Sequence, residues 1–430
     1  MKRFLFIIIL FCFSSANAQT ILSIDEALKI ALKNNYDISI ARNEGAVART
    51  NNTAGNAGML PDISLNASGN ITNKNIRYRP DSATPYTESN LNSGTQGVNI
   101  SLNWTLFDGG KMFITKERLS EVQTLGEIRF REQVLQTLSE VTASYYNVVK
   151  LKQQLASIDQ TIAYNRERLK IAETGFNSGA KKKTDLLQAK IDLNVNLENE
   201  INQQTLILAA KRELTKLLAV ESDSLIEVID TIVVEFSPDK NQLQDKLYSK
   251  NSSILAFEKQ LAIQRLLLKE SYRSQLPRLD LSAGYYYSRL NEVGTSGALT
   301  QTLYPQVGFN FKLPVYQSGD LRRQVALSKL GIESAQYNLE SLKLQVNTEL
   351  LNALTSFENQ KELLMIEREN YLLAKENMEI SLQRMRLGDA TSLEVRIAQT
   401  DFEQSATRLT NFQYNLKIAE TKLKQLLGEL

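Results

Sequence analysis

The sequence has no histidine, and its single cysteine, Cys12, lies close to the N-terminus. The lack of histidine excludes Ser–His and Cys–His nucleophilic centres and histidine metal sites, and one cysteine excludes an internal disulfide. Lysine and arginine number 50 against 48 aspartate and glutamate residues, whereas a nucleic-acid-binding protein needs a basic excess to contact phosphates. These absences argue against an enzyme, a metal or cofactor site and a nucleic-acid partner.

The first 18 residues are arranged like a signal peptide. Lys2 and Arg3 precede an unbroken apolar run over residues 4–13, and a segment of small residues follows that ends at Ala18. This layout predicts export with cleavage after Ala18. A transmembrane anchor is the alternative, but it needs about 20 apolar residues. No comparable run follows residue 18, so we expect any membrane-spanning segments of the mature chain to be β-strands.

The chain carries an internal duplication. Gly388 lies 209 residues after Gly179, Asn251 lies 216 residues after Asn35, and further matched pairs follow in the same order. Short solenoid repeats have periods of about 20 to 50 residues, so this longer period indicates two copies of a half-protein. We expect a first repeat at residues 19–219, a linker with a short strand at residues 220–239 and a second repeat at residues 240–430.

Each half contains two segments in which apolar and polar residues alternate. In the first segment Ile63, Leu65 and Ala67 alternate with Ser64 and Asn66. Period two indicates a strand with one apolar and one polar face, and each segment has about the 9 to 11 residues of a tilted transmembrane strand. A soluble β-sandwich alternates equally well. The expected strands cover about residues 62–71, 98–106, 278–287 and 306–313, with long polar loops around 77–92 and 291–302.

Three aromatic residues in these strands, Trp104, Tyr285 and Tyr287, are candidates for an aromatic belt at a lipid boundary. Buried aromatics of a soluble sheet are the alternative. Four strands cannot close a barrel, and an open sheet edge cannot face lipid because its backbone groups would be unpaired. A membrane sheet of this kind therefore requires several copies of the chain, and two or three copies would supply about eight or twelve strands.

Long helices occupy most of the remaining chain. Residues 111–177 and 320–386 contain no proline and little glycine, and in the second segment Leu339, Leu342 and Val346 recur at threes and fours. This spacing is typical of coiled-coil packing, and helices of roughly 100 Å need partner helices. Further helices are expected at residues 24–58, 184–219, 240–275 and 391–428.

In each half a short turn that contains glycine joins the long helix to the helix that follows it. Gly179 and Gly388 supply the positive φ that ends the first helix of each pair. Thr184 in the first half, and Thr391 with Ser392 in the second, can cap the helix that follows. The sequence therefore predicts two helical hairpins.

Two carboxylates come directly after these turns. Asp185 and Glu394 fall in the first turns of the following helices, where a negative charge interacts favourably with the positive end of the helix dipole. This structural role is as well supported by the sequence as a functional one.

In the order and spacing of these features the chain resembles the TolC-like outer-membrane efflux protein family over residues 20–430. The resemblance is carried by the duplication, by a Leu-Pro-x-[Leu/Ile] entry to the first strand of each half, by Phe107-Asp108-Gly109-Gly110 before the long helix, and by the turn at residues 386–394. It implies a mainly α fold with membrane β: four transmembrane strands per chain in a trimeric 12-stranded β-barrel, continued by a long α-helical coiled-coil periplasmic tunnel.

The resemblance also implies partners. A homotrimer in outer-membrane lipid would join a periplasmic adaptor (membrane fusion) protein and an inner-membrane transporter of the RND or ABC type. Asp185 and Glu394 would be candidates for the constriction of the tunnel, although the second acid of the family's pair falls on Ile397. The adaptor would contact the periplasmic tip, formed by Gly179, Thr184, Arg386, Leu387, Gly388, Thr391 and Ser392.

These observations predict a passive exit duct in the outer membrane, through which an efflux or secretion system conducts its substrates from the periplasm or an inner-membrane pump. A periplasmic coiled-coil protein with a β-rich end and a structural or adhesive role is the alternative.

Overall fold

The computed structural model describes residues 21–79, 81–82, 84–221, 226–229, 231–234, 236–240, 242–293 and 299–430. The expected signal peptide at residues 1–18 lies outside them. The chain divides into two compact units. Unit 1 contains residues 1–40, 132–251 and 345–430, and unit 2 contains residues 41–131 and 252–344. Both units are built from segments of both repeats, because each long helix contributes to both.

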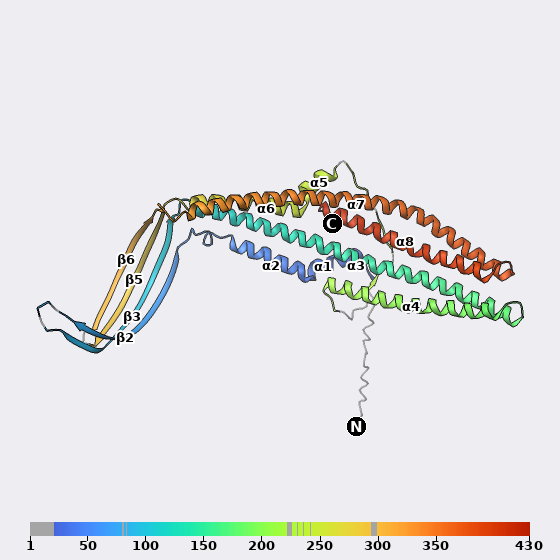
Figure 1. Cartoon of the computed structure of the whole chain (residues 1–430), viewed down its shortest axis with the longest axis horizontal. Helices are drawn as coiled ribbons and strands as arrows, with labels where there is room; N and C mark the ends of the chain where they lie inside the picture. Colours follow the sequence, from blue (N-terminus) through green and yellow to red (C-terminus); the bar gives the residue numbers. More distant parts are fainter. Residues whose placement is uncertain are drawn as a thin grey trace, which may run out of the picture. The chain divides into compact units, whose positions relative to one another are not determined.

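The helices and strands follow one another in the same order in the two halves (Figure 1). They are β1 (Ile21–Leu22), α1 (Ile24–Asn34), α2 (Tyr36–Asn51), β2 (Asp62–Tyr78), β3 (Tyr86–Phe107), α3 (Lys111–Asn177), α4 (Lys183–Leu218), β4 (Glu227–Val228), α5 (Leu243–Lys250), α6 (Ser252–Arg273), β5 (Arg278–Val293), β6 (Leu299–Lys312), α7 (Asp320–Leu387) and α8 (Ser392–Leu426). Among the described residues, no helix is long and apolar enough to cross a bilayer.

The duplication is visible in the backbone itself. Four pairs of residues that lie 209 positions apart both have a positive φ, although such a conformation is uncommon outside glycine. The pairs are Gly109 (φ 73°) with Ser318 (φ 51°), Gly110 (φ 79°) with Gly319 (φ 79°), Gly179 (φ 75°) with Gly388 (φ 87°), and Ala219 (φ 49°) with Gly428 (φ 67°).

Unit 2 contains a four-stranded antiparallel sheet in the order β2-β3-β5-β6. The register places the apolar positions of all four strands side by side, so that Ile63, Leu102, Ala283 and Val307 form one row across the sheet. Since side chains alternate along a strand, one face of the sheet is apolar and the other is polar. On the polar face the hydroxyls of Ser64 and Ser101 are 3.0 Å apart.

The strands are longer than the sequence suggested. β2 and β3 continue to Tyr78 and from Tyr86, through most of the expected loop at 77–92, and β5 and β6 shorten the other loop in the same way. The alternation of apolar residues ends earlier than the strands do, but Ser, Thr and Asn continue the antiparallel backbone ladder without an apolar face. Tyr78 and Tyr86 stack across its last pair, with ring centroids 4.9 Å apart.

A tight corner leads from β3 into α3 in unit 2. Asp108 accepts a hydrogen bond at its Oδ1 from the backbone N–H of Met112 (3.1 Å), which satisfies a free donor of the first helical turn. At Gly109 a Cβ would lie 2.5 Å from the Cβ of Leu276 and 2.8 Å from the carbonyl oxygen of Arg273, so only glycine fits. The segment that precedes β5 therefore packs directly against this corner.

The helices expected at residues 24–58 and 240–275 are each interrupted, which corrects that expectation. Asn35 separates α1 from α2, and Asn251 separates α5 from α6. The side-chain amide of Asn35 donates to the carbonyl oxygen of Leu217 (2.8 Å), and the amide of Asn251 donates to that of Leu426 (2.9 Å). The same contact is thus made twice. Asn35 also accepts hydrogen bonds at its Oδ1 from the backbone of the next helix, which restarts the helix as an N-cap does.

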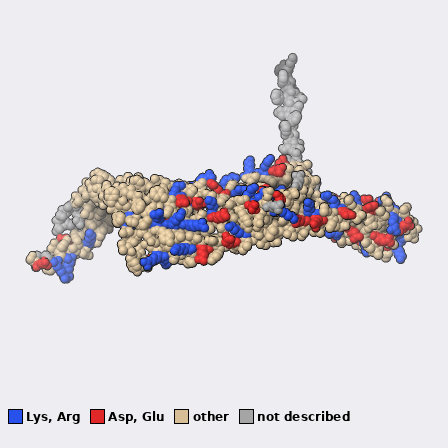
Figure 2. Space-filling model, turned by 90° about the horizontal axis from the view of Figure 1, so that it is seen from above, with Lys and Arg blue, Asp and Glu red and all other residues tan. Residues whose placement is uncertain are grey.

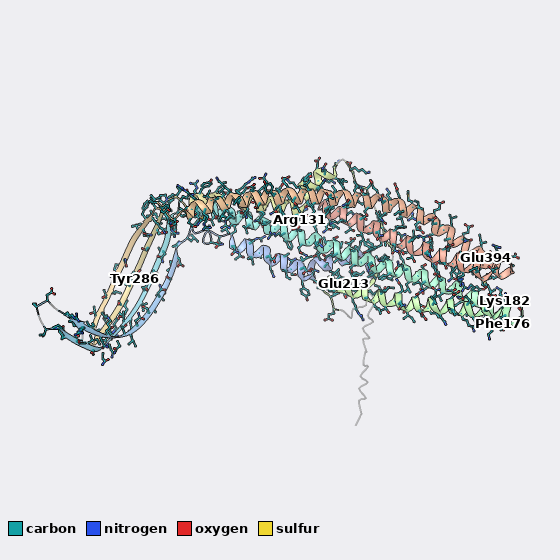
Figure 3. The ribbon with its side chains drawn as sticks, in the orientation of Figure 1. Arg131, Phe176, Lys182, Glu213, Tyr286 and Glu394 are labelled. Atoms are coloured by element: carbon teal, nitrogen blue, oxygen red, sulfur yellow. The ribbon has the colours of Figure 1, made fainter. Side chains whose placement is uncertain are left out.

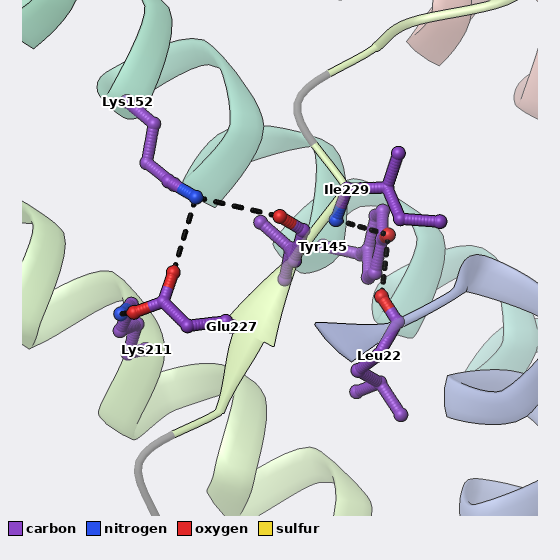
Figure 4. A network of polar contacts seen from close by, with 7 residues as sticks. Leu22, Tyr145, Lys152, Lys211, Glu227 and Ile229 are labelled. Atoms are coloured by element: carbon purple, nitrogen blue, oxygen red, sulfur yellow. Dashed lines mark hydrogen bonds and ion pairs between the residues drawn. The ribbon is translucent and has the colours of Figure 1, made fainter. Parts of the chain in front are cut away.

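The linker between the repeats contains a strand of two residues, β4. Among the described residues of the linker, Glu227 and Val228 are the ones that pair with other backbone, in parallel with Ile21 and Leu22. The buried Tyr145 hydroxyl donates to the carbonyl oxygen of Leu22 (2.8 Å) and accepts from the N–H of Ile229 (3.1 Å), as Figure 4 shows. Lys152 and Lys211 both form ion pairs with Glu227. Side chains of α3 and α4 therefore hold this two-stranded ribbon in place.

Candidate functional site

The hairpin α3–α4 in unit 1 ends in the turn predicted around Gly179. The carbonyl oxygen of Gly175 accepts hydrogen bonds from the backbone N–H groups of Ala180 (2.8 Å) and Lys181 (3.0 Å), and Gly179 takes the positive φ that allows this reversal. Burial lowers the pKa of Lys181, although Asp185 opposes the shift. The buried Lys181 Nζ has no hydrogen-bond partner among the described residues.

The hairpin α7–α8 ends in an equivalent turn at Gly388. The backbone N–H of Asp389 donates to the carbonyl oxygen of Arg384 (2.9 Å), and the Arg384 guanidinium donates to that of Asp389 (2.8 Å). Thr391 caps α8, because its hydroxyl accepts from the N–H of Glu394 (3.2 Å). No atom lies within 4 Å of the position that a Cβ on Gly388 would occupy, so its backbone conformation, and not its surroundings, calls for glycine.

The expected capping role of Thr184 is wrong. α4 begins one residue earlier than expected, at Lys183, and its N-cap is Lys182, which makes no side-chain capping hydrogen bond. Thr184 therefore lies within the first helical turn, where its hydroxyl cannot act as an N-cap. Ser392 is likewise the first residue of α8, with Thr391 as the cap.

The two hairpin ends lie next to each other in unit 1 (Figure 3), where Phe176, Lys182 and Glu394 are labelled. The Arg386 guanidinium on α7 pairs with the Glu167 carboxylate on α3 at 3.1 Å. A hollow of about 240 Å³ separates the hairpins and is lined by the predicted residues Thr184, Asp185 and Ser392. The structure thus brings two of the predicted tip residues, Thr184 and Ser392, and one constriction candidate, Asp185, around one space.

A polar cluster that was not expected also lines this hollow. Arg168 is buried, forms an ion pair with Asp192 and donates to Gln399 on α8 (3.1 Å). Gln188 donates to the same aspartate (2.7 Å). The sequence did contain a signal for this cluster. Arg168 lies three residues before Ile171 on α3, so the helical spacing places this basic residue on the same buried face.

The two predicted constriction acids are arranged differently. Asp185 lines the hollow between the hairpins, whereas Glu394 does not. The carboxylate of Glu394 lies 4.0 Å from the Arg384 guanidinium of its own hairpin, and both side chains are half exposed. The described residues of one chain therefore do not bring the two carboxylates together. Ile397, the position of the second family acid, is 54% exposed.

At the tip several apolar side chains are open to solvent. Leu387, in the second turn, is 79% exposed, and Leu393 beyond it is 56% exposed. Directly behind them the helices are well packed, since Met378, Met385 and Phe402 are fully buried in one cluster. The turn therefore presents an exposed leucine at the end of a firmly packed hairpin.

The predicted aromatic residues of unit 2 all lie on the apolar face of the sheet, but not at one level. Trp104 is in the row of Leu281 and Phe309, close to the helices, and its indole N–H donates to the carbonyl oxygen of Met59 (2.9 Å). Tyr285 and Tyr287 are further along β5, towards the end of the sheet that is away from the helices. Tyr286 points to the opposite face and stacks on Tyr304, with centroids 5.4 Å apart (Figure 3).

The apolar band between these aromatics has a defined height. Along β5 it extends from Leu279 to Tyr287, and at about 3.3 Å per residue these nine positions span about 26 Å along the strand. In a strand tilted by about 40° this length gives a band about 20 Å high, slightly less than the height of about 25 Å that transmembrane barrels carry. The next row contains Gln96 and Arg289, which ends the band. Figure 2 shows acidic and basic side chains interspersed over the helices and few on the sheet, except near its hairpin end.

The sequence model of one protein family matches nearly the whole chain. Its description is "outer membrane efflux protein", and it covers residues 27–220 and 243–429, one stretch in each repeat. The chain belongs to the outer membrane efflux protein family. Within this family the chain is an outer-membrane channel, an exit duct for efflux or secretion, with its helical part in the periplasm. The alternative of a structural or adhesive protein is not supported.

Several characterised family members are similar to this chain. Outer membrane protein TolC of Escherichia coli (strain K12) is 22% identical over 390 residues, which is 86% of this chain and 75% of TolC. The proteases secretion protein PrtF of Dickeya chrysanthemi is 19% identical over 426 residues, 97% of this chain and 90% of PrtF. The family therefore includes both efflux and secretion proteins.

Solved structures of outer-membrane channels have the same fold. The Campylobacter jejuni CmeC channel superposes with a TM-score of 0.79 at 17% identity, over 94% of this chain and 85% of CmeC. VceC of Vibrio cholerae gives 0.75 at 18% identity, over 94% of this chain and 96% of VceC. The helical tunnel segment with a β end, built from two repeats, is thus shared with these channels.

Proposed function

We propose that three copies of the chain close a single twelve-stranded barrel. The observation that carries this proposal is the open sheet of unit 2, in which β2 and β6 are edge strands without a further partner among the described residues. An open edge cannot face lipid, because each unpaired backbone group costs several kcal/mol there. Pairing β2 of one copy with β6 of the next removes every edge, and three sheets of four strands give a barrel wide enough for a channel.

The exposed side chains of the sheet support the same arrangement. Leu65 is 74% exposed, Val307 67% and Phe309 68%, which is expected of residues that lie against lipid in the assembled protein. We assign Trp104 to an aromatic girdle at the end of the apolar band near the helices, and Tyr285 with Tyr287 to the girdle at the other end. The polar face then lines the aqueous pore.

Native mass spectrometry of the purified protein tests the stoichiometry, and planar bilayers test the pore. We expect a mass of three chains and stepwise single-channel conductance. A stable monomer, or a trimer without conductance, would contradict the proposal.

The same bilayers test the constriction. If Asp185 and Glu394 line the narrowest part of the channel, the double variant Asp185→Asn with Glu394→Gln lowers the preference for cations. Glu213→Gln, an exposed acid paired with Lys216, is the control and leaves the preference unchanged.

The partners that we propose are a periplasmic adaptor protein and an inner-membrane transporter of the RND or ABC type. No phosphate-binding motif is present in the sequence, so the energy for export comes from such a partner. The tip residues Gly179, Arg386, Leu387, Gly388 and Thr391 form the contact with the adaptor, and the exposed Leu387 is its apolar centre.

A photo-crosslinking amino acid at Leu387, in cells that express the natural partners, tests this contact. We expect capture of the adaptor protein. Leu344 on the same helix is 72% exposed and serves as the matched control, which captures no adaptor. Equal capture of the adaptor protein at Leu387 and Leu344 would contradict the proposed contact at the tip.

A further inference from the structure

A second hollow, of about 520 Å³, lies in unit 1 where Ile232, Val234, Phe236 and Ser237 of the linker meet α7 and α8. It is separate from the hairpin ends and from the sheet. Its wall is apolar: Phe236 and Phe357 meet edge to face with centroids 6.0 Å apart, and Ile232, Val234, Leu364 and Leu416 continue the surface. The size and the lining are those of pockets that bind small molecules.

The linker side of the hollow is held in position by two lysines of α8. The Lys417 ammonium donates to the carbonyl oxygen of Val233 (2.8 Å), and the Lys424 ammonium lies 5.5 Å from the centroid of the Phe236 ring. Both lysines also form ion pairs with the buried Glu420. The wall is therefore pre-formed, which lowers the cost of ordering it around a ligand.

Two basic side chains, Lys361 and Arg368, line the hollow from α7. They are seven residues apart, which places them on one face of the helix with about 10 Å between them along its axis. Neither forms a hydrogen bond or an ion pair with any described residue.

The acids of this stretch of α7 do not neutralise the two cations. Glu358 pairs with Lys240 (2.5 Å), and Glu367 pairs with Arg408 (3.0 Å). Glu362 and Glu369 each follow one of the two cations directly, so they project about 100° away around the helix. The hollow thus combines an apolar wall with positive charge that pairs with no acid among the described residues.

We propose that this hollow binds an anionic amphiphile, a molecule with one carboxylate or sulfate head group and an apolar body. The aromatic and aliphatic wall would bury the body, and the head group would lie at the Lys361 and Arg368 side chains, of which arginine offers a bidentate fork. The amide of Gln413, which also lines the hollow, can donate a further hydrogen bond. The site does not depend on the trimer or on the adaptor contact.

Native mass spectrometry of the full chain in a non-ionic detergent tests the site, with sodium decanoate as the probe. We expect one saturable decanoate per chain, and weaker binding of decanol and of decyltrimethylammonium. Replacing both cations (Lys361→Gln with Arg368→Gln) should weaken decanoate binding about tenfold or more, because charge-assisted hydrogen bonds are lost. Ser237→Trp, which fills the hollow from its exposed linker side, should abolish binding with both cations intact.

A matched control is available on the same helix. Arg322 and Lys329 are also seven residues apart and exposed, and they have no partner among the described residues. Arg322→Gln with Lys329→Gln makes the same change in net charge far from the hollow along α7, and it should leave decanoate binding unchanged. Binding that does not saturate, that is equal for the cationic amphiphile, or that survives both Ser237→Trp and the Lys361/Arg368 double variant would overturn the proposal.

Discussion

At the scale of single residues, Glu227 shows how the linker is fixed and predicts a pH dependence. Burial raises the pKa of its carboxyl, but the hydrogen bonds from Lys211 and Lys152 outweigh burial and hold the pKa below the ordinary value of 4.5. A folded-state pKa below the unfolded one means that the carboxylate stabilises the fold above about pH 4.5, and that this stabilisation is lost as the pH falls through the folded-state pKa. Glu367 and Glu429 shift in the same direction.

We therefore expect the unfolding temperature of the purified protein to fall between about pH 5 and about pH 3, and Glu227→Gln to reduce that fall. The glutamine variant should be less stable than the parent near neutral pH, because both lysines lose their ionic partner. Thermal unfolding monitored by circular dichroism measures both effects. Glu198→Gln, at an exposed position of α4, should follow the parent at every pH. Parallel curves for the parent and Glu227→Gln would show that this network does not cause the acid sensitivity.

Single residues were also where the sequence was least informative. Gly179 and Gly388 were found because a positive φ after a long helix favours glycine, and Thr391 because a cap must carry an acceptor. The interaction of Arg168 with Asp192 could not be found, because it depends on the rotation of two helices about their axes. A one-residue difference at the start of α4 was enough to move Thr184 out of the capping position.

At the scale of the elements, the turn at Gly388 makes a prediction about assembly and activity. Gly388 has a φ of 87° and empty space around it, so Gly388→Val meets no clash but forces a β-branched residue into a conformation that costs about 1 to 3 kcal/mol. The penalty falls on the turn alone, because the packed cluster of Met378, Met385 and Phe402 lies behind it. We expect assembled channels that no longer support efflux.

Dye efflux by host cells measures the activity of this variant, and native gels of the extracted protein measure its assembly. Gln383→Val puts the same side chain at an exposed helical position of α7, five residues earlier, and should leave both unchanged. Normal efflux by assembled Gly388→Val channels would mean that the geometry of this turn is not needed for export.

The helices differed from expectation where a side-chain hydrogen bond interrupts a segment whose apolar spacing predicts one continuous helix. The long helices were readable from the absence of proline and from the spacing of leucines, both of which act over many residues. The interruptions at Asn35 and Asn251 were not, because each depends on a carbonyl group about 180 residues away in the sequence, that of Leu217 or Leu426. The strands likewise extend into polar sequence, since backbone pairing does not require an apolar face.

At the scale of the whole molecule, the duplication explains why the two repeats share one architecture. The contacts of Asn35 and Asn251 with Leu217 and Leu426 repeat, as do the positive φ angles at matched positions. The two halves have nevertheless diverged at the hairpins. The first packs around the Arg168–Asp192 pair, and the second packs around the apolar cluster with Phe402. Self-comparison of the sequence could reveal the shared architecture but not this difference in packing.

The assembled channel also depends on which face of the sheet meets lipid, and two residues of β6 separate the possibilities. Val307 is 67% exposed on the apolar face, in the row of Ala283 at the middle of the apolar band, whereas Asn310 points to the opposite face beside Asp280. Arginine on the lipid face costs about 2 to 4 kcal/mol near the bilayer midplane. Val307→Arg should therefore reduce the amount of trimer in isolated outer membranes. Asn310→Arg, which places the same charge beside an aspartate on the pore side, should leave trimer yield near that of the parent and change only conductance. The reverse result, with Asn310→Arg impaired and Val307→Arg normal, would mean that the polar face lies against the lipid.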